Sequence, residues 1–145
     1  MTAEQPITTA ERRLAAAAHL CALLSVLPLL GLFPTVGIYN RQKRTSPWVA
    51  QQAVQAALFQ VVTFNVILVL LAIVVPVALV GWGTRYDGGD LVLAVALTAL
   101  PFLAAHYLAQ GLLAMRAARS LRTGEEYRYR WIGKLVGPAV TERQL

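Results

Sequence analysis

Three long apolar stretches alternate with short polar segments along the chain, and this pattern predicts helices that cross a lipid bilayer. The stretches are residues 14–39, 57–82 and 91–115. Each is long enough to cross about 30 Å of hydrocarbon, which takes roughly 20 helical residues. We therefore predict an all-α, polytopic integral membrane protein whose 145 residues form a single membrane domain.

The first stretch differs from the other two by its prolines. Pro28 and Pro34 each remove a backbone donor. A glycine, Gly31 or Gly37, follows three residues after each proline, so we expect a helix that begins near Thr9 to kink or break here. The stretch then either spans the membrane or re-enters it as a hairpin whose irregular backbone is buried in protein.

The second and third stretches are predicted to be two transmembrane helices that form a hairpin. Residues 47–56 alternate small apolar residues with glutamines, so we interpret them as an interfacial amphipathic helix that leads into the second stretch. Trp48 and Trp82 would then mark opposite interfaces, the level that tryptophan prefers. A glycine-rich turn precedes the third stretch, and Thr123-Gly124 predicts the end of its helix.

Basic residues set the predicted orientation, because they accumulate on the cytoplasmic side. Three of the 13 lie between the first two stretches and seven lie in residues 116–145, whereas the turn of the hairpin has only Arg85. This distribution predicts a multi-pass protein of the bacterial inner (plasma) membrane with a cytoplasmic C-terminus. The polar N-terminal tail, residues 1–13, lies outside if the first stretch spans. The charge rule favours re-entry, which places this tail inside.

Composition excludes several classes of protein. The chain is 57% hydrophobic and 14% charged, against roughly 45–50% and about 25% in soluble domains, so neither a disordered nor an ordinary soluble protein is expected. No acidic residue lies within a predicted span, and no catalytic or phosphate-binding motif is present. We therefore expect no enzyme and no cofactor.

Uncharged polar residues form a predicted polar face within the membrane. Its side chains would hydrogen-bond between helices or to another subunit, or they would line a hydrophilic groove. The face consists of Gln52, Gln55, Gln60, Asn65, His106 and Gln110.

Two histidines, His19 and His106, are the weak candidates for ligands of a haem or a metal ion. If the first stretch spans, they lie about 8 Å and about 22 Å from the same membrane surface and do not meet. If it re-enters, they can approach each other. The alternative is that each imidazole is neutral and bonded to a neighbouring carbonyl or glutamine.

Basic residues next to the span ends are predicted to bind anionic lipid headgroups, each contributing about 1 kcal/mol. Tyrosines and a tryptophan are interleaved with them in the C-terminal segment. No RNA-binding or DNA-binding fold fits the rest of the chain, so we expect a lipid bilayer and no nucleic acid as partner. The headgroup-binding set is Arg41, Lys43, Arg44, Arg116, Arg119, Arg122, Arg128 and Arg130.

Four short motifs over residues 10–135 resemble the bacterial Tic-twenty-like family (domain of unknown function four-eight-seven-zero), which is related to a chloroplast inner-envelope import component. Two departures from its pattern are Arg130, where proline is usual, and Leu58, where asparagine is usual. The motifs are His19-Leu20, Ser46-Pro47 in the basic loop, the Q-A-x-x-F-Q pattern of Gln55, Ala56, Phe59 and Gln60, and the G-x-x-Y-R-Y pattern of Gly124, Tyr127, Arg128 and Tyr129.

Three functions are compatible with these features. The first is a non-enzymatic accessory subunit that packs against another membrane protein or a second copy of itself through its small and amide-bearing faces. The second is a translocation or transport pore component, as the resemblance implies. The third is a histidine-ligated haem or metal protein.

Overall fold

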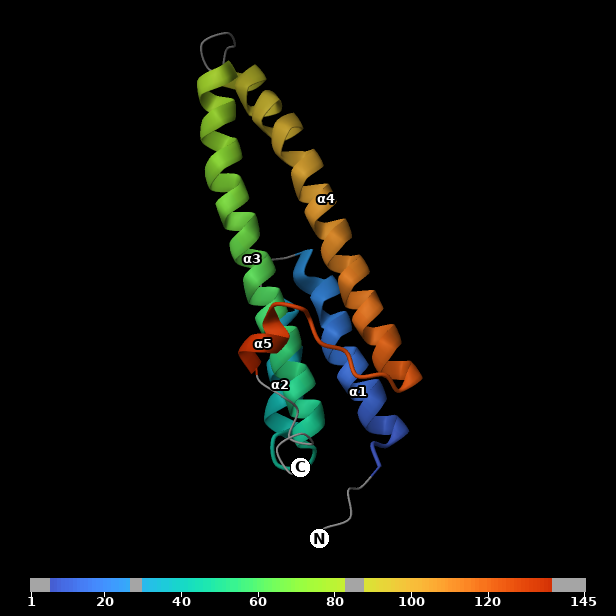
Figure 1. Cartoon of the computed structure of the whole chain (residues 1–145). Helices are drawn as coiled ribbons and strands as arrows, with labels where there is room; N and C mark the ends of the chain where they lie inside the picture. The colour runs from blue at the N-terminus through green and yellow to red at the C-terminus, as the bar shows by residue number, and fades with distance from the viewer. Residues whose placement is uncertain (1–5, 27–29, 83–87, 137–145) are drawn as a thin grey trace.

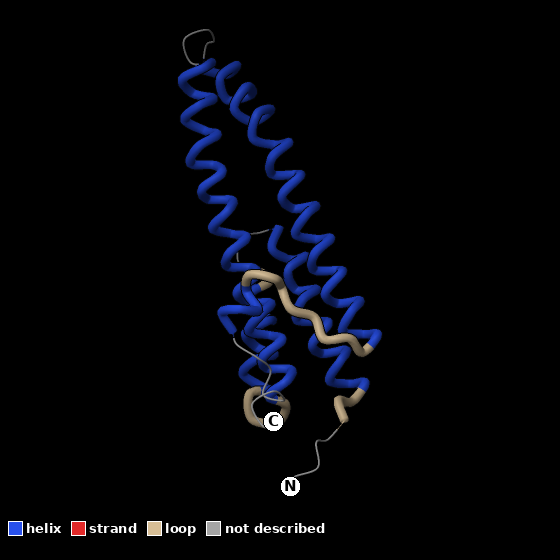
Figure 2. Tube along the Cα trace, viewed as in Figure 1, coloured by secondary structure: helices blue, strands red, loops and turns tan. Residues whose placement is uncertain are grey.

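The computed structural model describes residues 6–26, 30–82 and 88–136, and these contain helices and turns but no strand (Figures 1 and 2). The prediction of an all-helical chain is therefore confirmed. Pro28, the turn residues 83–87 and the last nine positions lie outside the described residues. The elements are α1 (Thr9–Leu20), the 3-10 helix η1 (Cys21–Val26), α2 (Leu32–Gln42), α3 (Pro47–Trp82), α4 (Gly88–Thr123) and α5 (Ile132–Val136).

Helix α1 begins with a capping box. The backbone N–H of Glu11 donates to the Thr8 hydroxyl at 3.2 Å, and the backbone N–H of Thr8 donates to the Glu11 carboxylate at 2.8 Å. These bonds satisfy donors that the first turn of a helix leaves free. Hydrogen bonds from the hydroxyl of Ser46 and from Thr8 lower the pKa of Glu11. The start of α1 is thereby tied to the loop that precedes α3.

Helices α1 and α2 form a short hairpin around η1, so the first apolar stretch turns back instead of forming one straight helix (Figure 1). Thr35 of α2 joins the two arms, because its hydroxyl can donate to the carbonyl of Gly31 at 2.8 Å or of Ala18 at 3.3 Å. Pro34 does not kink a helix. It lies in the first turn of α2, where its missing N–H leaves no hydrogen bond unmade.

Helices α3 and α4 form a hairpin that is much longer than α1 and α2 (Figure 1). Each has 36 residues, so each extends about 54 Å, well beyond the ~30 Å of a hydrocarbon core. Pro76 and Pro101 lie within them without ending them. The expected interfacial helix and the second span are therefore one continuous helix. It ends at Trp82, whose side chain lies outside what the structure describes.

The half of this hairpin that lies towards its turn, residues 61–80 of α3 and 90–109 of α4, exposes apolar side chains. Val80 is 78% exposed and Val92 is 71% exposed. Only 11% of the most apolar 18-residue stretch of α3 is buried, and only 6% of that of α4. The core helix of a soluble protein is mostly buried. Both helices are long and apolar enough to cross a membrane. Buried apolar side chains in this part are Ile67, Ala78, Ala94 and Ala99.

The other half of the hairpin is the base of a small bundle. Helix α1 packs against α3 and α4, whereas α2 and α5 pack against α3. The core is rich in alanine, which lets helices approach closely, and it also contains fully buried polar side chains such as His19 and Gln52. The alanines of this core are Ala15, Ala16, Ala18, Ala22, Ala50, Ala53, Ala56, Ala114, Ala117 and Ala118.

Helix α4 ends in a Schellman motif at Gly124, which has a φ of 94°. The N–H of Gly124 donates to the carbonyl of Leu121 at 3.3 Å, and the N–H of Glu125 donates to the carbonyl of Ser120 at 3.0 Å. The chain reverses here, and the extended segment 125–129 runs back across α1 towards α5 (Figure 1).

Replacing Gly124 by alanine is expected to lower the free energy of unfolding by about 1–2 kcal/mol, because a side chain is strained at this φ. The added Cβ would also overlap the Arg12 guanidinium. Thermal unfolding in detergent measures the effect. Gly37→Ala is the matched control, since its Cβ would meet nothing within 4 Å and alanine favours a helix. Equal midpoints for the two variants would contradict the expectation.

Candidate functional site

The bundle encloses a group of polar and aromatic side chains from distant parts of the sequence, here called the histidine–tyrosine cluster. His19 lies near the end of α1, and Gln52 and Phe59 lie on one side of α3. Tyr127 and Tyr129 come from the extended segment after α4. Alternate residues of an extended segment point the same way, so both tyrosines face the bundle.

His19 is fully buried, and both of its ring nitrogens have partners. Nδ1 lies 3.1 Å from the hydroxyl of Tyr129, and Nε2 lies 3.2 Å from Oε1 of Gln52. An amide oxygen can only accept, so Nε2 carries the proton and the tyrosine hydroxyl donates to Nδ1. The geometry therefore selects a neutral imidazole in one tautomer.

The electrostatics of the cluster favour the same uncharged state. Burial lowers the pKa of His19 to about 4, although the hydrogen bond to Gln52 opposes this shift. Burial also raises the pKa of Tyr129, and the neighbouring Tyr127 adds to the rise. Neither group changes its charge near neutral pH, whereas general acid–base catalysis needs a pKa close to the working pH. The arrangement suits a structural contact rather than proton transfer.

Aromatic contacts fix the segment after α4 to two helices at once. The ring of Tyr129 stacks on Phe59 of α3, with centroids 4.3 Å apart and planes 4° apart. The ring of Tyr127 meets His19 of α1 edge-on at 6.1 Å and Tyr129 edge-on at 5.1 Å. Such pairs contribute about 0.5–1.5 kcal/mol each beyond burial. The cluster therefore holds residues 125–131, here called the C-terminal segment, against the bundle.

The predicted polar glutamines are buried between helices. Gln60 of α3 donates to the hydroxyl of Thr35 in α2 at 3.0 Å, and Gln110 of α4 donates to the carbonyl of Ala22 in η1 at 3.2 Å. The amide of Gln55 is fully buried, and neither of its polar atoms has a hydrogen-bond partner among the described residues. The amides of Gln60 and Gln110 thus link the short hairpin to the long one.

Asn65 and His106 do not join these glutamines. Asn65 is exposed, and its amide donates to the carbonyl of Val61 in its own helix at 2.8 Å. It follows Gln52 by thirteen residues, which turns it about 220° around the helix axis at 3.6 residues per turn. Asn65 therefore lies on another side of α3 than Gln52. His106 is half-buried on α4, and its ring meets Tyr107 edge-on at 5.9 Å.

The ligand and pore hypotheses have no geometric support. Within the described residues, no three His, Cys, Asp or Glu side chains are grouped so that they could hold a metal ion. Protein groups occupy both nitrogens of His19. A cavity of about 450 Å³ lies between α1 and α2, and one of about 390 Å³ lies along α3 around Val66. Neither is lined by Gln52, Gln55 or Gln110, and of the predicted polar face Asn65 lines the second cavity.

The predicted headgroup-binding residues are mostly exposed at the end of the molecule where α3 begins and α4 ends (Figure 1). Arg128 differs, because it is half-buried and forms an ion pair with Glu126 at 2.9 Å. Its charge is therefore partly balanced within the protein. The exposed members of the set are Arg41, Lys43, Arg44, Arg116, Arg119, Arg122 and Arg130.

Two outward-facing apolar helices joined to a small bundle with an uncharged polar core define a membrane-associated helical protein. The chain belongs to the magnetosome magnetite crystal formation protein family (MamF/MmsF), whose model matches residues 10–136. No curated protein and no solved structure matches the chain.

This match corrects the resemblance drawn from the four motifs, so the assignment to the Tic-twenty-like family is wrong. In the structure, these motifs record helix packing. Phe59 contacts Tyr129 of the last motif, and Gly124 allows the reversal that brings this tyrosine back. Short patterns of this kind contain residues that pack together, and they are too brief to identify a family.

Sequence reasoning missed the contact between the tyrosines and His19, which lies 110 positions from Tyr129. Tyrosines beside a span end were interpreted as part of a membrane-facing surface, where such rings are common. The available signal was their spacing. Two tyrosines separated by one residue, the first of them three positions after a helix-ending glycine, place both rings on one side of an extended segment.

Proposed function

We propose that this chain is a non-enzymatic accessory protein of the magnetosome membrane that takes part in magnetite crystal formation. The observation that carries the proposal is the family match over residues 10–136. The two apolar helices support it, because their exposed side chains need a lipid environment.

The proposed placement puts residues 61–82 of α3 and the facing part of α4 in the bilayer. Residues 61–82 extend about 33 Å, close to the ~30 Å thickness of hydrocarbon. The basic end would face the cytoplasm. The hairpin of α1 and α2 would then re-enter from that side, since Leu24 and Phe33 near its apex are 52% and 75% exposed.

An accessory role follows from what the bundle offers. Its buried histidine and tyrosines are uncharged and fully engaged in contacts within the chain. The exposed hairpin offers a valine-rich surface around Asn65 to other membrane proteins or to a second copy, and an amide in such a surface can hydrogen-bond across a helix interface.

Deleting the gene from magnetite-forming host cells is the direct test. Electron microscopy is expected to show crystals of altered size or shape, and restoring the wild-type gene should reverse the change. A tagged protein should stay in the magnetosome membrane fraction after alkaline carbonate extraction, because its spans are held by lipid. An unchanged crystal population would contradict the proposed role, and release by carbonate would contradict the proposed placement.

A further inference from the structure

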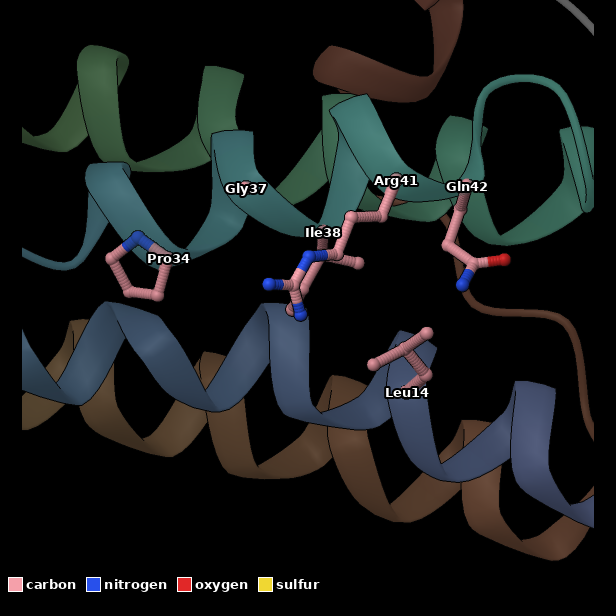
Figure 3. Close-up of a pocket in the computed structure, with 6 residues that line it drawn as sticks. All are labelled: Leu14, Pro34, Gly37, Ile38, Arg41 and Gln42. Atoms are coloured by element: carbon pink, nitrogen blue, oxygen red, sulfur yellow. The ribbon is translucent and has the colours of Figure 1, made fainter.

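The cavity between α1 and α2 is a groove lined by both apolar and polar side chains. Leu14 of α1 lies opposite Ile38 of α2, and Pro34 lies towards the apex of the short hairpin (Figure 3). Arg41 and Gln42 belong to the last turn of α2, next to the basic loop, and the Arg41 side chain reaches back along the groove as far as Ile38 (Figure 3). The distance along α2 from Pro34 to Gln42 is about 12 Å. The groove therefore runs from the basic end of the molecule towards its exposed apolar surface.

A glycine keeps this groove open. Gly37 lines it midway along α2, and a Cβ built there would meet nothing within 4 Å. Glycine within a helix costs about 1 kcal/mol relative to alanine, so the fold itself would be better served by a side chain at this position. The cavity of about 450 Å³ is thus bounded by a position that a larger residue could fill.

An unpaired cation lies over the apolar lining. The Arg41 side chain extends from α2 towards α1, and its guanidinium lies beside Ile38 (Figure 3). No carboxylate of the described residues pairs with it, and none lines the groove. The carboxylate of Glu11, on the neighbouring helix, is bonded to Thr8. The groove therefore complements a ligand with an anionic end and an apolar body.

We propose that this groove binds one anionic phospholipid from the leaflet at the basic end of the molecule. The phosphate is held by Arg41, because a guanidinium matches phosphate with two parallel hydrogen bonds. The upper part of an acyl chain packs against Leu14, Ile38 and Pro34, and the rest extends past Phe33 into the hydrocarbon. Lys43 and Arg44 add positive charge at the headgroup level. This inference rests on the membrane placement proposed above.

Native mass spectrometry of the full chain in mild detergent tests the site with two probes, phosphatidylglycerol and phosphatidylcholine with the same acyl chains. The wild type should retain one phosphatidylglycerol in preference to phosphatidylcholine. Arg41→Gln should weaken phosphatidylglycerol binding about tenfold, the loss expected for a charge-assisted hydrogen bond. Lys134→Gln removes the same charge from α5, which does not line the groove, and should bind like the wild type.

Gly37→Leu tests whether filling the groove blocks lipid binding while the fold stays intact. It should abolish retention of both lipids while keeping or raising the thermal midpoint, since its Cβ enters open space. Equal retention of the two lipids by the wild type, or affinity of Arg41→Gln within twofold of wild type, would overturn the proposal. Carbonate extraction of the membranes from which each variant is purified separates the two failures. A carbonate-resistant protein without lipid preference refutes only the lipid site, whereas a carbonate-released protein refutes the membrane placement as well.

Discussion

Replacing Tyr129 by alanine is expected to detach the C-terminal segment from the bundle. The substitution removes the ring stacked on Phe59 and the hydroxyl that donates to His19. Truncating a buried aromatic side chain typically costs about 3–5 kcal/mol. Trypsin cleavage after Arg128 measures the detachment, because the bond lies next to the buried Tyr129. The cleavage rate should rise by about 100-fold or more if cleavage follows the open population.

Two further variants make this experiment specific. Trp131→Ala removes an aromatic ring from the same segment, but this ring is 84% exposed, so cleavage after Arg128 should stay at the wild-type rate. Tyr129→Phe keeps the stacked ring and leaves Nδ1 of His19 without a donor, which costs about 1–3 kcal/mol. Its cleavage rate should fall between those of the wild type and Tyr129→Ala. Equal rates for Tyr129→Ala and Trp131→Ala would show that the cluster does not hold the segment.

Acidification from pH 7 to pH 4 is expected to destabilise the bundle by about 3 kcal/mol through His19 alone. The pKa of His19 is about 4 in the folded chain and about 6.5 when the ring is exposed. The unfolded chain therefore takes up the proton first, and stability falls as the pH drops from 6.5 towards 4. The groups that face His19 are Gln52, Tyr127 and Tyr129, and none of them is charged at these pH values.

Thermal midpoints in detergent at several pH values measure this dependence. His19→Gln should lower stability at pH 7 and remove most of the fall between pH 6.5 and 4.5, whereas His106→Gln should keep it. Glu11 adds to the fall only near the acid end of this range, because its carboxyl has a pKa of about 4.3 in the unfolded chain and hydrogen bonds from Ser46 and Thr8 lower its pKa in the folded chain. A wild-type midpoint that stays constant from pH 7 to pH 4.5 would refute the buried neutral imidazole.

The helices could be predicted from the sequence because their signals are local. The lengths of the apolar stretches predict α3 and α4, the Thr8 and Glu11 pair fits the start of α1, and Gly124 fits the end of α4. The predicted polar face comes from a list of polar residues along the chain, and such a list ignores their angle around the helix axis. Asn65 shows this, because it points away from the buried glutamines.

The tertiary contacts could not be predicted in the same way. The hydroxyl of Tyr129 donates to His19 only because a reversal at Gly124 and the packing of α1 against two long helices bring the two residues together. Neither event is visible in local patterns. The groove between α1 and α2 likewise depends on the angle between two short helices. Arg41 was predicted as one of eight equivalent headgroup contacts, whereas the structure places it alone over an apolar lining.

The two ends of the molecule differ in width. Of the part of the chain that the structure describes, α3 and α4 alone form the narrow end, whereas α1, α2 and the C-terminal segment lie beside them at the basic end (Figure 1). Embedded as proposed, the chain takes up more cross-sectional area at the cytoplasmic surface of the bilayer than at the opposite surface. Such a wedge packs with least strain where the cytoplasmic surface is convex. It would therefore fit more easily into the membrane of a small vesicle inside the cell than into a flat membrane.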